Sequence, residues 1–141
     1  MSEIKLTTDG IRYIALFEKE TGASIKDCIV DDDRIIYVVN TGDMGAAIGR
    51  NGDHINKIKR AVDKHIELVE YSDDPATFIK NAFGNVSIKS VKILPKKEKQ
   101  LAYVETSNVD KGIAIGREGR NIEKVKILAN RHHGIDDVVL Q

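Results

Sequence analysis

The sequence predicts an α+β fold in which one small αββααβ unit occurs twice. A shift of 67 residues places the motif Ile-Gly-Arg-x-Gly at Ile48 on the same motif at Ile115. Ahead of each motif, a segment of helical period precedes two strand-like runs joined by a turn. The length of 141 residues fits one or two small domains. We therefore expect two domains, residues 1–72 and 73–141, which a linker of only Ser-Asp-Asp joins rigidly.

The first unit opens with a helix that Thr8 or Asp9 can cap and that Gly22 stops. Two strands then flank an Asp-rich turn, and a short helix follows; they are predicted over residues 24–30, 34–40 and 43–48. After a tight turn comes a helix with four apolar residues on one face: Ile55, Ile58, Ala61 and Val62. The run IELVEY closes the unit as a strand.

The second unit repeats this order. Asp74 caps its first helix and Pro75 takes the first helical position. Four apolar residues of this helix face inward: Phe78, Ile79, Ala82 and Phe83. The strands VSIKSVKIL and QLAYVET follow, with PKKEK as the turn between them, and IDDVVL is the last strand.

A second match between the units concerns two tyrosines. YVVNT at Tyr37 matches YVETS at Tyr103 with a shift of 66 residues instead of 67. This match predicts a one-residue difference in the loop between strand and motif, where length changes are tolerated. It also predicts that both tyrosines are buried at equivalent positions. Packing in the core is likewise expected for Phe17, Phe78 and Phe83 and for the lone Cys28.

The paired glycines of each motif suit a tight turn between two helices, because glycine has no Cβ. The second glycine opens a helix, whose free N–H groups and positive dipole end attract an anion. Arg50 and Arg117 lie in the turn and can reach a phosphodiester oxygen. Ile48 and Ile115 offer an apolar wall beside the turn.

Charge is distributed to match these motifs, although the net charge of the chain is zero. Residues 45–65 and residues 112–133 each hold five basic and two acidic residues. Solvation of a helix face explains Lys57, Lys59, Lys124 and Lys126 about as well as phosphate contact does. Their position beside the loop arginines favours phosphate contact.

Other functional classes find little support. The spacing Gly-x3-Gly-x2-Gly from Gly45 fits neither a dinucleotide-binding fingerprint nor a P-loop, and no nucleophile elbow is present. We therefore expect no enzyme activity and no cofactor. The histidines lack metal-site spacing, which predicts no metal. Without an apolar run of membrane length or a signal peptide at the first residues, a cytoplasmic chain without membrane contact is expected.

The string Ile-Gly-x-x-Gly-x-x-Ile-x-x-Ile/Val, present twice inside αββααβ units, resembles the KH domain, whose GXXG loop clamps the backbone of about four nucleotides. The element order resembles the type II form, and the tandem arrangement is similar to the NusA family, in particular its short archaeal members. The resemblance implies single-stranded RNA as partner and a role in transcription termination or antitermination. Processing of ribosomal RNA, or a protein-docking adaptor built on KH folds, is the alternative.

The resemblance maps the two loops onto residues 49–52 and 116–119. The predicted RNA-binding residues are Ile48, Gly49, Arg50, Asn51, Gly52, Lys57, Ile115, Gly116, Arg117, Glu118, Gly119, Arg120 and Lys124. Glu118 places a carboxylate where a phosphate is expected, which would make the second loop the weaker clamp unless the neighbouring Arg120 offsets that charge. Bacterial members carry a polymerase-binding domain and an S1 domain, for which this chain has no room. Contact with RNA polymerase or the transcription machinery is therefore left open, and a monomer is expected.

Overall fold

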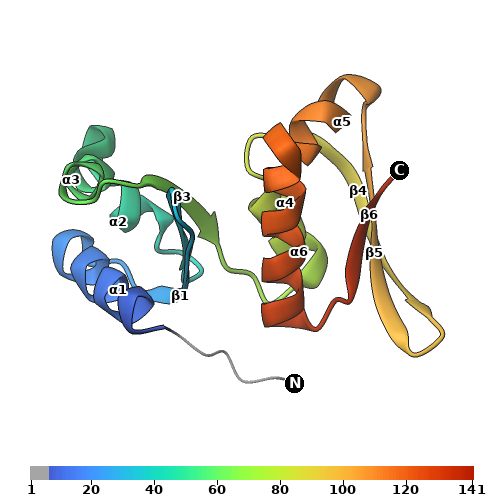
Figure 1. Ribbon diagram of the computed structural model, residues 1–141, viewed down its shortest axis with the longest axis horizontal. Helices are drawn as coiled ribbons and strands as arrows, with labels where there is room; N and C mark the ends of the chain where they lie inside the picture. The colour runs from blue at the N-terminus through green and yellow to red at the C-terminus, as the bar shows by residue number, and fades with distance from the viewer. Residues whose placement is uncertain (1–6) are drawn as a thin grey trace. The chain divides into compact units, whose positions relative to one another are not determined.

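The computed structural model describes residues 7–141, so the first six residues of the predicted first domain lie outside the described range. The chain divides into two compact units between Ser72 and Asp73. Residues 7–72 are called the first unit below, and residues 73–141 the second unit. Each unit has the predicted αββααβ order, and in each the helices cover one face of a three-stranded sheet (Figure 1).

The first unit has a central strand flanked by one antiparallel and one parallel neighbour. Its elements are α1 (Thr8–Thr21), β1 (Ile25–Val30), β2 (Arg34–Val39), α2 (Met44–Ile48), α3 (Asp53–Ala61) and β3 (His65–Glu70). β1 pairs antiparallel with β2, and β2 pairs parallel with β3. All six residues of the central strand β2 are buried.

Helix α1 begins at a threonine cap and ends at a glycine. The Oγ1 atom of Thr7 accepts the N–H of Gly10 at 2.9 Å, so the cap lies just before the predicted Thr8 or Asp9. Three neighbouring residues can cap here, and only the backbone geometry selects among them. Gly22 ends the helix in the left-handed region (φ 77°), as predicted.

The core of the first unit lies between α1 and the sheet. Phe17 and Tyr37 are both fully buried, with ring centroids 4.4 Å apart. The Tyr37 hydroxyl donates to the carbonyl of Tyr13 at 3.0 Å, and burial raises the pKa of this phenol above its ordinary value. Cys28 is buried in β1, as expected.

The apolar face predicted for α3 is correct except at its end. Ile58 is fully buried and Val62 is buried, whereas Ala61 is exposed. The helix stops at Ala61, and Val62 already has extended backbone (φ −129°, ψ 134°). The last turn therefore no longer follows the helical period on which the prediction rests.

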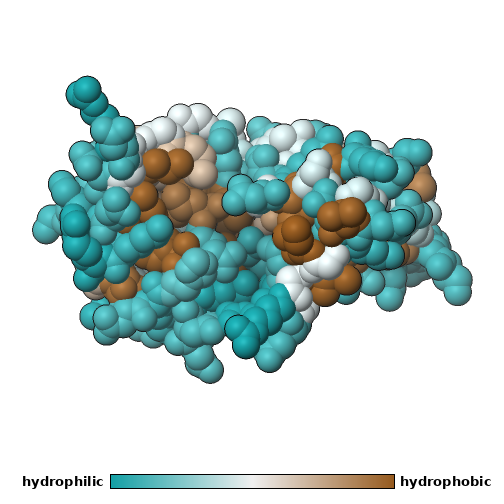
Figure 2. Space-filling view, turned by 90° about the horizontal axis from the view of Figure 1, so that it is seen from above, coloured by the Kyte–Doolittle hydropathy of each residue, from teal (hydrophilic) through white to brown (hydrophobic). Residues whose placement is uncertain are grey.

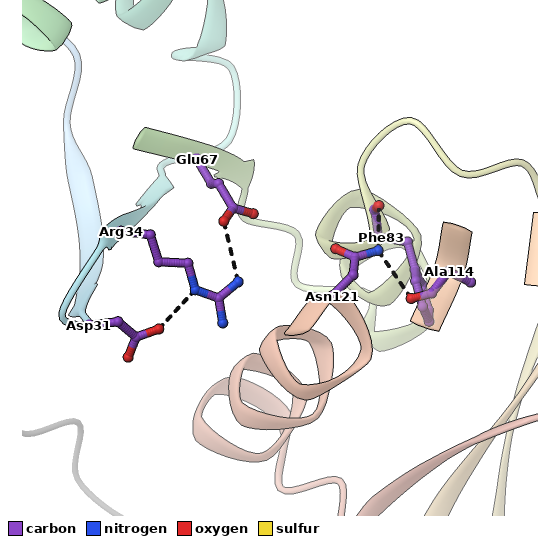
Figure 3. A network of polar contacts seen from close by, with 6 residues as sticks. All are labelled: Asp31, Arg34, Glu67, Phe83, Ala114 and Asn121. Carbon is purple, nitrogen blue, oxygen red and sulfur yellow. Dashed lines mark hydrogen bonds and ion pairs between the residues drawn. The ribbon is translucent and has the colours of Figure 1, made fainter. Parts of the chain in front are cut away.

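The Asp-rich turn of the first unit is held by Arg34. Its Nε donates to Asp31 at 2.8 Å and its Nη1 to Glu67 at 3.3 Å (Figure 3). The Arg34 side chain is only 7% exposed, so these carboxylates compensate a nearly buried charge. The turn is thus tied to β3 and is more than the solvated connection that its composition suggests.

The second unit has the same topology. Its elements are α4 (Pro75–Phe83), β4 (Ile88–Lys96), β5 (Lys99–Thr106), α5 (Asn108–Ile115), α6 (Arg120–His133) and β6 (Asp137–Leu140). β4 pairs antiparallel with β5, and β5 pairs parallel with β6, so β4 is an edge strand. The four α4 residues predicted to face inward are all buried.

Asp74 caps α4, as predicted. Its Oδ2 accepts the hydroxyl of Thr77 at 2.6 Å and the N–H of Thr77 at 3.1 Å. These two hydrogen bonds lower the pKa of Asp74 below its ordinary value, because they favour the ionised carboxylate. Pro75 takes the first helical position, where its missing N–H is not needed.

The β4–β5 hairpin is longer than predicted. Pro95 pairs with Gln100 and Lys96 with Lys99, so the five residues PKKEK are not all turn. Only Lys97 and Glu98 form the turn, with Lys97 at φ 59°. Proline is compatible with this strand because β4 lies at the sheet edge.

The two sheets share one register. Ile25 pairs with Val39 before the register shifts in the first sheet, and Ile88 pairs with Thr106 before the same shift in the second. Val39 and Thr106 are 67 residues apart, which is also the separation of the two motifs. The predicted one-residue difference between strand and motif is therefore wrong.

The match of the two tyrosines is wrong for the same reason. The residue equivalent to Tyr37 is Val104, and both are fully buried. Tyr103 alternates with the buried Val104 along β5 and so lies on the opposite face of its sheet, half-exposed and paired with Lys92. A shift of one residue moves a strand side chain to the other face.

The face drawn in Figure 2 is mostly hydrophilic and is interrupted by apolar patches. The exposed large apolar residues of the described chain are Ile11, Ile48, Leu94, Val109, Ile113, Ile115 and Ile127. Within residues 7–141, no helix has both the length and the apolar character needed to cross a membrane.

Candidate RNA-binding loops

The first predicted loop joins α2 to α3 through a single turn of 3-10 helix. Ile48 ends α2, and Gly49 leaves it with φ 76° and ψ 173°. Asn51 then adopts the left-handed region (φ 56°, ψ 26°), and so does Gly52 (φ 78°, ψ 15°). The Gly52 N–H closes the turn on the Gly49 carbonyl at 3.2 Å.

The second loop has almost the same backbone. Gly116 has φ 79° and ψ 172°, Glu118 has φ 56° and ψ 27°, and Gly119 has φ 72° and ψ 13°. The Gly119 N–H closes the turn on the Gly116 carbonyl at 3.1 Å. The sequence repeat is therefore also a structural repeat at the level of single dihedral angles.

The first glycine of each loop is required by space as well as by its dihedral angles. A Cβ atom on Gly49 would lie 2.6 Å from Cγ and 2.8 Å from the backbone N of His54. On Gly116, it would lie 2.7 Å from Cβ and 2.9 Å from the backbone N of Asn121. The following helix thus passes directly over these glycines, and backbone atoms cannot move aside.

The second glycine of each loop is required only by its dihedral angles. The nearest atom to a Cβ on Gly52 would be 3.5 Å away, and none lies within 4 Å at Gly119. This open space lies at the start of α3 and α6. An approaching group can therefore come close to the backbone there.

The helices that follow the loops begin without a side-chain cap. Gly52 and Gly119 are their N-caps, and neither has a side chain to offer. By contrast, side chains of Thr7, Asp74 and Ser107 cap α1, α4 and α5. The N-terminal ends of α3 and α6 are therefore suited to an external anion.

His54 and Asn121 hold the loops in this shape, although the sequence did not single them out for this role. His54 Nδ1 lies 2.6 Å from the Ala46 carbonyl, and because a carbonyl only accepts, Nδ1 must carry the proton. Asn121 Nδ2 donates to the Ala114 carbonyl at 3.2 Å and to the Phe83 carbonyl at 3.3 Å (Figure 3). Each residue stands five positions after the first loop glycine, which is the signal that could have identified it.

Most predicted contact residues are accessible around the loops. Ile48 is 40% exposed and Ile115 is 38% exposed. The side chains of Arg50, Asn51, Lys57, Arg117 and Glu118 are exposed, and the loop glycines Gly49, Gly52, Gly116 and Gly119 and Arg120 are partly exposed. In each unit the loop therefore places an arginine, an apolar residue and a helix N-terminus together at the surface.

Lys124 contradicts the exposure that its predicted role requires. It is only 5% exposed, whereas Lys57, at the equivalent position of the first unit, is exposed. α6 buries a broad stripe that includes Val125, Leu128 and Lys124, whereas only Ile58 is buried in α3. Lys124 is therefore removed from the candidate contacts.

Lys126 also has a structural partner. Its Nζ lies 3.3 Å from Oδ1 of Asp137, and both side chains are about half-exposed (45% and 50%).

Among the described residues, no group of three histidine, cysteine or acidic side chains could hold a metal ion.

Comparison with known proteins assigns both units to one family. A model of the KH domain matches residues 11–96, which is more than half of the chain. A model of the NusA-like second KH domain matches residues 75–135. The two matches include both loops.

The chain is similar over nearly its whole length to named relatives and to a solved structure. The chain is 41% identical over 137 residues to the probable transcription termination protein NusA of Halococcus morrhuae, covering 97% of this chain and 98% of that protein. The protein of that name from Methanococcus vannielii is 37% identical, over 96% of this chain and 78% of the relative. The crystal structure of APE1850 has a TM-score of 0.81 at 36% identity and covers 96% of this chain and 100% of that chain. The chain belongs to the NusA-like family of KH-domain proteins.

Proposed function

We propose that this chain is a single-stranded RNA-binding protein that acts in transcription termination, with its two glycine loops gripping the RNA backbone. The observation that carries the proposal is the pair of loops with nearly identical dihedral angles, each leading into a helix without a side-chain cap. A family member that had lost RNA binding would be expected to lose loop glycines or basic residues. Both loops retain them.

The mechanism follows from the groups that meet at each loop. A phosphate sits at the open N-terminus of α3 or α6, where backbone N–H groups and the helix dipole favour negative charge. Arg50 and Arg117 reach phosphate oxygens from the turn. Ile48 and Ile115 face the unstacked bases beside the backbone. Phosphate contacts give affinity and register, and base contacts give sequence preference.

The proposed role in termination follows the names of the relatives, which are called probable transcription termination proteins. RNA emerging from a polymerase is single-stranded before it folds, so a backbone clamp can act on it regardless of sequence. We propose that the chain works together with the transcription machinery in this way.

Charge reversal in the loops tests the clamp. The variant R50D/N51D/R117D/E118D should lose RNA binding, measured by fluorescence anisotropy with labelled single-stranded RNA, while its thermal unfolding stays cooperative. Asp tolerates the left-handed backbone of positions 51 and 118 better than most residues. The variant R12D/K19Q, which places one aspartate and one neutral residue at exposed positions of helix α1 outside the loops, provides a control that also makes the protein more negative. Retained binding by the loop variant would refute the clamp.

Variants of a single loop test whether both clamps contribute. Only four residues separate the end of β3 at Glu70 from the start of α4 at Pro75. Such a short connection gives the second loop a high effective concentration once the first is bound. R50D/N51D and R117D/E118D should each weaken binding to a long RNA far more than to a short one. Equal losses on both RNAs would mean that the loops act independently.

A further inference from the structure

The β4–β5 hairpin of the second unit is strongly basic. Residues 89–99 contain one glutamate, Glu98, and five lysines: Lys89, Lys92, Lys96, Lys97 and Lys99. All five lysines are exposed. No ion pair joins any of them to another residue in the described part of the chain. The positive charge of this hairpin is therefore available to an external anion.

The strand register places three of these lysines on one face of the sheet. Lys92 pairs with Tyr103, and Lys96 pairs with Lys99. The neighbours of Tyr103 along β5, Ala102 and Val104, are fully buried on the opposite face, which the helices of this unit cover (Figure 1). Lysines and the half-exposed tyrosine thus share the outer face of the hairpin.

Two features at the tip of this hairpin lower the stability of the fold. Lys96 and Lys99 are directly opposite each other, where like charges about 4.5–5.5 Å apart at Cβ destabilise a strand pair. Lys97 in the turn has a positive φ of 59°, which is unfavourable for a residue other than glycine. The equivalent turn of the first unit is acidic, and there Arg34 pairs with Asp31. A bound anion would relieve the repulsion at the lysine tip.

A recess lies at the same tip. Its volume is about 730 Å³, and it is lined by Lys96, Lys97, Lys99 and Leu101 together with Glu98, Asp136 and Asp137. Asp136 accepts the N–H of Gln100 at 2.7 Å and Asp137 pairs with Lys126, so these two carboxylates are already engaged, and three lysines of the lining face the remaining carboxylate of Glu98. The recess is large enough for a small organic group such as a nucleotide.

From this arrangement we propose that the outer face of the β4–β5 hairpin is a second RNA-binding surface, separate from the glycine loops. Lys92, Lys96 and Lys99 contact phosphates, and Tyr103 stacks on a base. Lysines that follow a strand beside an aromatic side chain are the combination that binds single-stranded nucleic acid without sequence preference. The proposal rests on the proposed function, because RNA held by the loops is the polyanion that this face meets.

A competing explanation is that the lysines only protect an edge strand. Charged residues on an edge strand such as β4 prevent pairing with other chains. Edge protection works with either sign of charge, whereas phosphate binding requires a positive one. Charge reversal therefore separates the two explanations.

The test compares K92E/K96E/K99E with R12E/K19E/K80E, which changes the net charge equally at exposed positions outside the hairpin. The probe is a labelled single-stranded RNA of about 20 nucleotides, longer than one small module covers. The hairpin variant should bind at least about tenfold more weakly, and its log–log salt slope should fall by about 2, at roughly 0.7 per lost phosphate contact. K92Q/K96Q/K99Q should lose less, and the control should bind like the unmodified protein.

Tyr103 has its own test. Tyr103→Phe keeps the ring and should bind as the unmodified protein does, whereas Tyr103→Leu should bind about tenfold more weakly. Thermal unfolding of both variants shows whether the sheet is intact, and binding is compared only for variants that unfold cooperatively. Equal affinities for the phenylalanine and leucine variants would remove the stacking role.

The loop variants make failure of this proposal distinguishable from failure of the proposed function. If the loop variant loses binding but the lysine variant does not, the clamp stands and the hairpin surface is refuted. If the lysine variant loses binding but the loop variant does not, the clamp fails. A lysine variant that binds RNA normally but no longer binds an acidic polypeptide would show that the face recognises protein instead.

Discussion

His54 and Asn121 occupy the same position in the two units and hold their loops by different side chains. His54 Nδ1 lies 2.6 Å from the Ala46 carbonyl, and Asn121 Nδ2 lies 3.2 Å from the Ala114 carbonyl. In both cases a ring or amide N–H, placed by the first turn of the second helix, reaches back to the helix before the loop. The contact fixes the angle between the two helices at the point where the loop glycine is crowded.

Removal of this contact should weaken both the fold and RNA binding. We expect Asn121→Ala to lower the free energy of unfolding by about 1–2 kcal/mol, since neutral hydrogen bonds contribute about 0.5–1.5 kcal/mol each. RNA affinity should also fall because the loop loses its orientation. Denaturant unfolding and RNA titration measure the two effects.

Asn130 gives a matched control for this variant. It lies in the same helix and donates from Nδ2 to the Ile135 carbonyl at 3.1 Å, at the end away from the loop. Asn130→Ala should destabilise the protein without changing RNA affinity. If both variants reduce affinity equally, Asn121 has no specific role in the loop.

The loop glycines should show a graded sensitivity to alanine. Gly116→Ala combines a positive φ with a backbone clash. The left-handed conformation alone costs an alanine about 1–2 kcal/mol, so this variant should lower the free energy of unfolding by more than that. Gly119→Ala should cost only that conformational amount, because no atom lies within 4 Å of its Cβ position. Gly112→Ala, inside α5 with open space and ordinary backbone, should be neutral or stabilising by about 0.5–1 kcal/mol. Thermal or denaturant unfolding gives the order, and an equal loss at all three positions would contradict it.

The residue at the left-handed position should set the difference between the two clamps. Asn51 and Glu118 have the same backbone (φ 56°), but asparagine tolerates it better and adds no negative charge. Glu118→Asn should therefore raise RNA affinity at low salt, and Asn51→Glu should lower it. The gain should shrink as salt rises, because screening weakens the repulsion that is removed. Unchanged affinity in both swaps would mean that this side chain faces away from the RNA.

Asp74 should contribute stability that depends on pH. Its pKa is lowered in the folded state because Thr77 donates two hydrogen bonds to the ionised form. The contribution is therefore complete above the pKa of aspartate in the unfolded chain, and it is lost as pH falls through the lower folded value. The difference in unfolding free energy between the unmodified protein and Asp74→Ala should shrink in acid. Thr7→Ala removes a cap that does not titrate, and its effect should stay constant over the same range.

The sequence predicted the repeated αββααβ unit and the two loops because both depend on local chemistry. Glycines mark the turns, apolar residues recur at helical or strand period, and Asp74 with Pro75 marks a helix start. These signals act within a few residues. The structure follows them with small shifts at the ends of elements, as at Thr7 and Ala61.

The errors concern contacts that local signals do not specify. Tyr37 and Tyr103 match when the two sequences are aligned, but the pairing with the neighbouring strand sets the register of each sheet. This register makes Val104 the equivalent of Tyr37 and places Tyr103 on the other face of its sheet. Lys124 was predicted to contact phosphate because it lies beside the loop arginines in the sequence, yet α6 buries more of its circumference than α3 does. His54 and Asn121 share no residue type, so only the geometry reveals their common role.

The side chains at positions 50–51 and 117–118 are exposed. The crowding at Gly49 and Gly116 and the hydrogen bonds of His54 and Asn121 determine the path of the chain through each loop. Positions 50 and 117 therefore accept other side chains without a change of loop shape, whereas positions 51 and 118 favour residues that tolerate a positive φ. Evolution or protein engineering can therefore change the side chains of one proposed clamp, and with them its RNA preference, without changing the other loop or the fold of either unit.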